Sequence, residues 1–158
     1  MTRYTPPPPE SKPVAAYGAK LQSAVDAAAL ALLECIYADH PAGITTAEAA
    51  GVDASHFTDD LQILWLAADV GRELSRPRLF RLAARALARC HFWDARAPLC
   101  SYGSLRWSET TLEHLFGAMF PTDAGTRHAA AKLLSLTKLQ RDFTANLRTL
   151  DCMLAEVA

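Results

Sequence analysis

The sequence lacks the features that mark a secreted or membrane-spanning protein. Its longest run without a charged residue falls far short of the ~20 apolar residues that a membrane span needs. Met1 leads into the proline run Pro6–Pro9 rather than into an apolar segment, which predicts that no secretory signal is present. Its four cysteines occur without a secretory context, which favours reduced thiols over a disulfide framework. We therefore expect a soluble, cytoplasmic protein.

The common catalytic motifs are also absent from the sequence. It contains no glycine-rich phosphate loop, no Gly-x-Ser-x-Gly turn and no His-Glu-x-x-His pair. A metal or thiol sensor would have to use Cys90, His91 and Cys100. A zinc site could add His114, although structural zinc sites usually contain a close cysteine pair, which is absent here. We predict that the protein is not an enzyme and has no metal or cofactor site, with a sensor as the third interpretation.

What is present is a strongly uneven distribution of charge. Residues 21–71 contain eight acidic residues and no lysine or arginine, whereas residues 72–96 contain seven arginines and two acidic residues. Such segregation indicates a polar partner for the basic segment, either nucleic acid or an acidic protein surface. The alternative is that the two segments face each other within the fold or across a dimer.

The apolar periodicity predicts a mainly α-helical protein. Residues 1–13 hold five of the nine prolines and are expected to form a disordered tail. A helix is predicted over residues 14–39, with one buried stripe formed by Leu21, Val25, Ala28, Leu32 and Cys35. A short helix with a capping box of Thr45 and Glu48 follows, then a turn at Gly51, and then a helix over 54–68 capped by Asp53.

Residues 72–82 have two interpretations. They could form a two-stranded wing that turns at Ser75–Pro77, or they could begin a helix with Ser75 as its cap and Pro77 in its first turn. Helical spacing is clear from Leu82 onward. Either way, residues 14–92 are predicted to form one helix-turn-helix domain, possibly winged.

Residues 93–158 are predicted to be a loop followed by a helical dimerisation region. The loop covers 93–108, and a short helix then runs to Phe120. The last helix opens at Thr122 or Asp123 and runs nearly to Val157. Apolar residues repeat along it in heptads, which is typical of a coiled-coil seam with one polar residue that sets the register. The seam consists of Leu133, Leu136, Gln140, Phe143, Leu147, Leu150, Leu154 and Val157. It predicts a homodimer, or alternatively one buried helix of a monomeric bundle.

Part of the predicted domain resembles a known family. Residues 32–82 resemble the helix-turn-helix of the winged-helix bacterial repressors of ArsR-like type. The matching residues are Thr46, Ala47, Gly51, Val52, Ser55, Thr58, Leu61 and Leu64. The resemblance implies that Ser55, His56 and Thr58 lie near the bases of DNA, and that Arg72, Arg76 and Arg78 contact its phosphates from a wing. One departure is that the recognition helix carries Asp53, Asp59 and Asp60 and no lysine or arginine, which opposes DNA binding.

The arginines of residues 78–89 would form one row on a helix. Arg78, Arg81, Arg85 and Arg89 follow one another at spacings of three and four residues. Together with the resemblance, this row predicts a dimeric DNA-binding transcriptional regulator that acts by occupying its operator. The alternative is a non-catalytic protein-interaction module on a helix-turn-helix scaffold that has lost DNA binding, with an acidic or regulatory protein as its partner.

Overall fold

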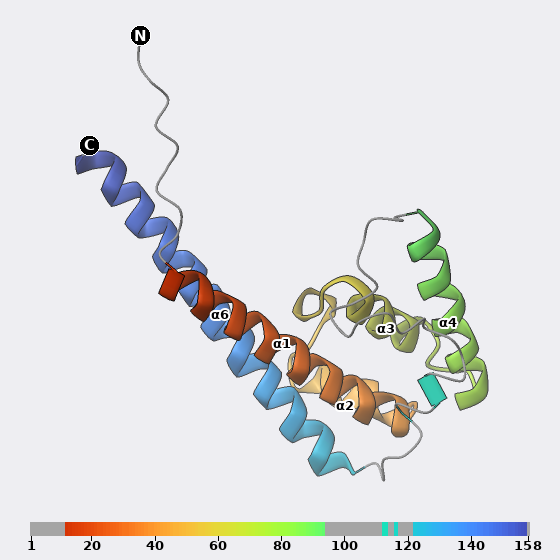
Figure 1. Cartoon of the computed structure of the whole chain (residues 1–158). Coiled ribbons are helices and arrows are strands. Elements are labelled where there is room, and N and C mark those ends of the chain that lie inside the picture. The colour runs from red at the N-terminus through yellow and green to blue at the C-terminus, as the bar shows by residue number, and fades with distance from the viewer. Residues whose placement is uncertain (1–11, 94–111, 114–115, 117–121, 158) are drawn as a thin grey trace.

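The protein folds around a pair of long helices (Figure 1). The computed structural model describes residues 12–93, 112–113, 116 and 122–157. Helix α1 spans Lys12–Ala38 and helix α6 spans Asp123–Val157. The two helices lie side by side and run antiparallel, because Gln22 contacts Gln140 while Tyr17 contacts Phe143. The predicted stripe of α1 is buried at all five positions, as its helical spacing requires.

Three shorter helices and one 3-10 turn complete the described fold. Helix α2 spans Ala42–Ala49, the turn η1 spans Ala54–His56, α3 spans Asp59–Val70 and α4 spans Arg76–Trp93. The described residues contain no β-strand. The mainly α-helical class is therefore confirmed. Helices α3 and α4 pack together at the end of the molecule that lies away from the C-terminus of α6 (Figure 1).

The core extends from the α1–α6 pair through α2 and α3 to α4. Tyr37 of α1 is at its centre, with its ring stacked on Phe116 at a centroid distance of 4.8 Å and tilted against Phe80 at 5.7 Å. Its hydroxyl donates a 2.7 Å hydrogen bond to the carbonyl oxygen of Leu64 on α3. Phe57 and Trp65 form a second buried stack beside η1.

The start of α2 differs from the prediction. The helix begins at Ala42, so Thr45 lies inside it and forms no capping box with Glu48. The early start depends on Gly43, because a Cβ at this position would come within 2.8 Å of the Cα of Ile36. Close approach of α1 and α2 therefore determines this boundary, and the local capping pattern does not.

The predicted helix over 54–68 is divided in two. Asp53 accepts a hydrogen bond from the backbone N–H of Ser55, as expected of a cap, but it caps only the η1 turn. Phe57 and Thr58 are extended, and α3 begins at Asp59, whose φ is 50°. The chain breaks here because Phe57 turns inward to stack on Trp65.

The wing interpretation of residues 72–82 is wrong. The chain makes a turn over residues 71–74 and enters α4 at Arg76, directly after Ser75. The carbonyl oxygen of Ser75 accepts the 2.9 Å bond from the N–H of Leu79, and Pro77 lies in the first turn where its missing N–H is not needed. Burial of Leu79, Phe80, Ala83 and Leu87 on one helical face outweighs the imperfect strand alternation.

The predictions for the remaining segments are tested only in part. The proline-rich segment 1–11, the loop over 94–108 and most of the helix before Phe120 lie outside the described residues. Within that last segment Leu112 and Phe116 are described, and both are buried in the core.

Helix α1 is long and apolar enough to cross a membrane by length and composition. A core helix of a soluble protein passes the same test, and half of this stretch is buried inside the protein.

Candidate interaction surface

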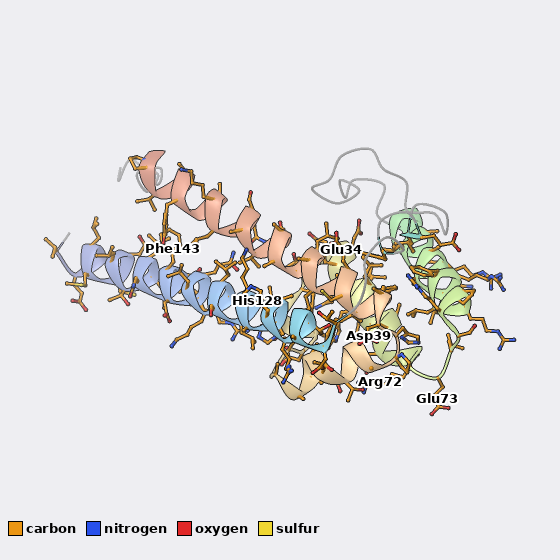
Figure 2. All side chains as sticks on the ribbon, turned by 90° about the horizontal axis from the view of Figure 1, so that it is seen from below. Glu34, Asp39, Arg72, Glu73, His128 and Phe143 are labelled. Atoms are coloured by element: carbon orange, nitrogen blue, oxygen red, sulfur yellow. The ribbon has the colours of Figure 1, made fainter. Side chains whose placement is uncertain are left out.

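Helix α4 presents two chemically different faces. Leu79, Phe80, Ala83 and Leu87 point into the core, while Arg78, Arg81, Arg85 and Arg89 are exposed. Among the described residues no ion pair involves Arg78, Arg85 or Arg89, whereas Arg81 already interacts within the chain. Side chains with nitrogen tips extend from the outer side of α4, away from the α1–α6 pair (Figure 2). The arginine row is thus formed, and three of its members are available to a partner.

An apolar groove lies beside this row, between α3 and α4. Its volume is about 310 Å³, and its lining side chains are Ile63, Leu66, Ala67, Val70, Leu82 and Ala86. Leu66 is 43% exposed and Val70 is 80% exposed, so the groove opens to solvent. Arg78, Leu82, Arg85 and Arg89 follow at spacings of four, three and four, so Leu82 shares its side of the helix with three arginines. One edge of the groove is therefore cationic.

Sequence reasoning missed this groove, although it leaves a signal. Ile63, Leu66, Ala67 and Val70 follow at spacings of three, one and three residues, which is one apolar stripe of a helix. A second stripe, which includes Leu61, Leu64 and Ala68, is buried in the core. Helix α3 is thus apolar on two sides, and on the second side Leu66 and Val70 are exposed while Ala67 is buried and Ile63 is half-buried. We define the groove and the three arginines, Arg78, Arg85 and Arg89, as the α3–α4 surface.

The two arginines that precede the row, Arg72 and Arg76, make contacts within the protein. Arg72 donates to Asp69 Oδ1 at 2.7 Å from Nη2 and 3.1 Å from Nε, and it also binds Glu48. These two carboxylates raise the pKa of Arg72. Arg76 donates to the carbonyl oxygen of Phe116 at 3.1 Å and lies over the ring of Phe80. Arg72 therefore links α2 to the end of α3, and Arg76 packs against the edge of the core at Phe80 and Phe116.

The three residues expected near DNA bases have different environments. His56 is buried, and its Nδ1 accepts the backbone N–H of Asp53 at 3.0 Å, so it does not face a ligand. Ser55 is exposed, but its hydroxyl donates to Asp53, and this bond lowers the pKa of that carboxyl. Thr58 is exposed at the start of α3 and makes no capping hydrogen bond through its side chain. Asp53 and Asp59 are both exposed next to them, and Arg141 of α6 lies near Asp53.

The predicted seam of α6 is divided between two environments. Its first half packs on α1 of the same chain: Leu133 is buried, Gln140 Nε2 donates to Gln22 Oε1 at 2.6 Å, and Phe143 meets Tyr17 edge-on at 5.0 Å (Figure 2). Leu136 and Leu147 are half-buried in the same stretch. For this half the interpretation of packing within one chain is correct. Leu150, Leu154 and Val157 are exposed.

The polar contact between α1 and α6 extends to a carboxylate. Gln22 accepts from Gln140 through its oxygen and donates through Nε2 to Asp26 Oδ1 at 2.9 Å. Partial burial raises the pKa of Asp26 and opposes the lowering effect of this hydrogen bond. The polar residue expected to set the register of a dimer thus forms a hydrogen bond between α6 and α1 of the same chain.

The described side chains contain no group of three or more histidine, cysteine or acidic residues that could hold a metal ion. Cys90, His91, Cys100 and His114, the candidates for a sensor, lie outside the described side chains. Of the cysteines that are described, Cys35 is buried and Cys152 is exposed, and both are free thiols. Burial is the main reason why the pKa of Cys35 is raised, which disfavours its reactive thiolate form.

Comparison of the chain with protein-family models, curated proteins and solved structures finds no match. The functional argument therefore depends on the surface itself.

Proposed function

We propose that the protein is a non-catalytic protein-interaction module whose α3–α4 surface binds an acidic amphipathic helix. The proposal is carried by an open apolar groove, because Leu82 on its α4 side shares one side of that helix with the exposed Arg78, Arg85 and Arg89. An amphipathic helix binds a groove by inserting apolar residues spaced three and four apart. Carboxylates on the side of such a helix would meet Arg78, Arg85 and Arg89, which can bind them in bidentate geometry.

The two parts of this surface contribute differently. Full burial of an aliphatic side chain such as Leu66 or Val70 contributes roughly 1.5–3 kcal/mol. Exposed ion pairs contribute roughly 0–1 kcal/mol each and are weakened by salt. The groove thus supplies most of the affinity, while the arginines select an acidic partner over a basic one.

The scaffold is proposed to be of helix-turn-helix type. The order of a long helix, a short helix, a turn and a longer helix supports this interpretation, with Gly51 at a φ of 101° in the turn. The exposed side of α3, where such scaffolds read DNA, carries apolar and acidic residues and no lysine or arginine. Carboxylates oppose phosphate contacts, which supply most of the nonspecific affinity for DNA. These features favour a module that has lost DNA binding.

Fluorescence anisotropy with a designed peptide tests the proposal. The probe is a labelled helical peptide with leucines at three- and four-residue spacing and glutamates along one side. We expect binding that becomes at least about tenfold weaker in the variant Arg78→Glu/Arg85→Glu, because two attractions turn into repulsions. Arg81 is left unchanged because it interacts within the chain.

A matched control has the same change of charge elsewhere. Lys132→Glu/Lys138→Glu replaces two exposed cations of α6, and it is expected to bind the peptide like the wild type. A peptide in which lysine replaces glutamate should bind weakly to the wild type. The proposal is wrong if the acidic peptide does not bind, or if both double variants bind it equally well.

A dimeric DNA-binding regulator is the second candidate, and the exposed Arg78, Arg85 and Arg89 on one side of α4 are the observation in its favour. The same assay with mixed-sequence duplex DNA over a salt series separates the two functions. We expect no binding above about 100 mM salt. Binding that falls steeply with salt and is lost in Arg78→Glu/Arg85→Glu would instead assign the arginine row to phosphates.

A further inference from the structure

The end of α6 extends beyond the helix that covers the rest of it. In the antiparallel pair, Gln140 lies opposite Gln22 and Phe143 lies opposite Tyr17, so the first residues of α1 lie opposite residues near Thr149. Residues 150–157 continue as a regular helix for about 12 Å past this point. Figure 1 shows this extension at the C-terminal end of α6.

This extension is itself an acidic amphipathic helix. Its exposed apolar residues are Leu150 at 58%, Met153 at 56%, Leu154 at 62% and Val157 at 89%. They follow at spacings of three, one and three residues, which place them on one side of the helix. Asp151 and Glu156 are its charged residues, and it contains no lysine or arginine. We call residues 150–157 the α6 extension.

The α6 extension and the α3–α4 surface are complementary in charge and both are apolar. One is a helix with an apolar side and two carboxylates, and the other is an apolar groove with three exposed arginines at its edge. They lie at opposite ends of the molecule, and α6 is one continuous helix, so the extension of a chain does not reach its own groove (Figure 1).

We propose that the α6 extension of one copy of the chain docks in the α3–α4 groove of a second copy. Leu150, Leu154 and Val157 would enter the groove, and one of the two carboxylates that flank this apolar side, Asp151 or Glu156, would face the arginines of α4. The inference rests on the proposed function, because it names the occupant of the same surface. It also replaces the symmetric coiled-coil seam expected from the sequence with a contact between two different surfaces.

The size of the contact limits its strength. Four large apolar side chains on the extension bury much less than the ~800 Å² per partner of a stable interface. A single contact is therefore weak, with an expected Kd on the order of micromolar. Two such contacts related by a two-fold axis would close a dimer, whereas repetition of one contact from copy to copy would build longer assemblies.

A charge swap tests the inference with the full chain. One variant, Asp151→Arg/Glu156→Arg, has a basic extension and the native basic rim. The other, Arg78→Glu/Arg85→Glu, has an acidic rim and the native acidic extension. In each variant alone the two surfaces repel, so we expect sedimentation velocity to show association at least about tenfold weaker than in the wild type.

Mixing the two variants restores both complementary pairs. The basic extension of the first variant meets the acidic rim of the second, and the acidic extension of the second meets the basic rim of the first. We expect hetero-association within about threefold of the wild-type affinity. Lys132→Glu/Lys138→Glu is the control and should associate like the wild type. All the altered side chains are exposed, so we expect each variant to keep its helices. Circular dichroism of each variant checks this expectation.

The outcomes separate the two proposals. Wild-type chain that stays monomeric at several hundred micromolar would overturn the inference, as would association that neither charge-reversed variant weakens. In either case the designed acidic peptide is tested separately. If it binds and its binding is weakened in Arg78→Glu/Arg85→Glu, the proposed function stands, and the α3–α4 surface binds a helix other than the α6 extension. If the charge swap restores association, both proposals are supported. Association with no peptide binding, independent of the arginines, contradicts both.

Discussion

At the scale of single residues, Tyr37 joins three elements of the core. Its ring packs between Phe80 of α4 and Phe116, while its hydroxyl donates to the carbonyl oxygen of Leu64 in α3. Sequence reasoning assigned no role to this tyrosine, because a single aromatic residue in an alanine-rich helix has no distinctive spacing. The carbonyl that it satisfies is 27 residues away.

Tyr37→Phe removes this hydrogen bond and keeps the ring. Since the carbonyl of Leu64 then loses its side-chain donor in a buried site, we expect a loss of about 1–2 kcal/mol in the free energy of unfolding. Urea denaturation followed by circular dichroism measures the loss. Tyr17→Phe alters an exposed tyrosine and serves as the control, with no measurable change expected.

The same tyrosine makes stability depend on alkaline pH. Burial raises the pKa of Tyr37 far above its ordinary value of 10.0, so the folded protein keeps the proton while the unfolded chain loses it. The unfolded state binds fewer protons above pH 10, and the free energy of unfolding therefore falls as the pH rises, by up to ~1.4 kcal/mol per unit. Below pH 10 the effect is absent. Thermal unfolding of the wild type between pH 8 and 11 should show this fall, and Tyr37→Phe should reduce it.

Gly43→Ala tests the close approach of α1 and α2. The added Cβ would lie 2.8 Å from the Cα of Ile36, and backbone cannot move aside without separating the helices. We expect a loss of about 1–3 kcal/mol. In Gly18→Ala, by contrast, the nearest atom is 3.4 Å away in the ring of Phe143, and better helix propensity should offset any strain. Equal losses in both variants would contradict this account.

At the scale of elements, the long helices could be predicted and the short ones only in part. Helices α1 and α6 have apolar residues at regular spacing over many turns, so their boundaries agree with the sequence within a few residues. The break between η1 and α3 depends on Phe57 stacking on Trp65, a tertiary contact that overrides the local helical pattern. The spacing of the arginines predicted their common row, but it could not show that Arg72 and Arg76 bind within the chain.

Two substitutions in α6 separate the covered part of this helix from the free part. Phe143→Ala removes a ring that packs on Tyr17 and Gly18, so we expect a loss of about 1–3 kcal/mol in the free energy of unfolding of the monomer. Leu154→Ala alters a side chain that is 62% exposed and should change this energy by less than about 0.5 kcal/mol. Only Leu154→Ala should weaken self-association, and urea denaturation with sedimentation velocity checks both effects.

At the scale of the whole molecule, the uneven charge of the sequence has two structural outcomes. Arg72 of the basic segment forms ion pairs with Glu48 and Asp69 of the acidic segment, so the two segments contact each other within one chain. Arg78, Arg85 and Arg89 remain exposed, as the interpretation of an external partner requires. The sequence could predict that the charges would separate, but not how they divide between these two uses, because that division depends on how α4 packs.

The pairing of α1 with α6 also bears on how the protein is made. Gln22 and Gln140 are 118 residues apart, so the contacts of α1 with α6 cannot form until nearly all of the described chain has left the ribosome. Until then the apolar stripe of α1 stays uncovered by its main partner, and closure of so long a loop slows folding. The growing chain is thus exposed to aggregation during synthesis, and its yield should depend on chaperones that hold apolar helices.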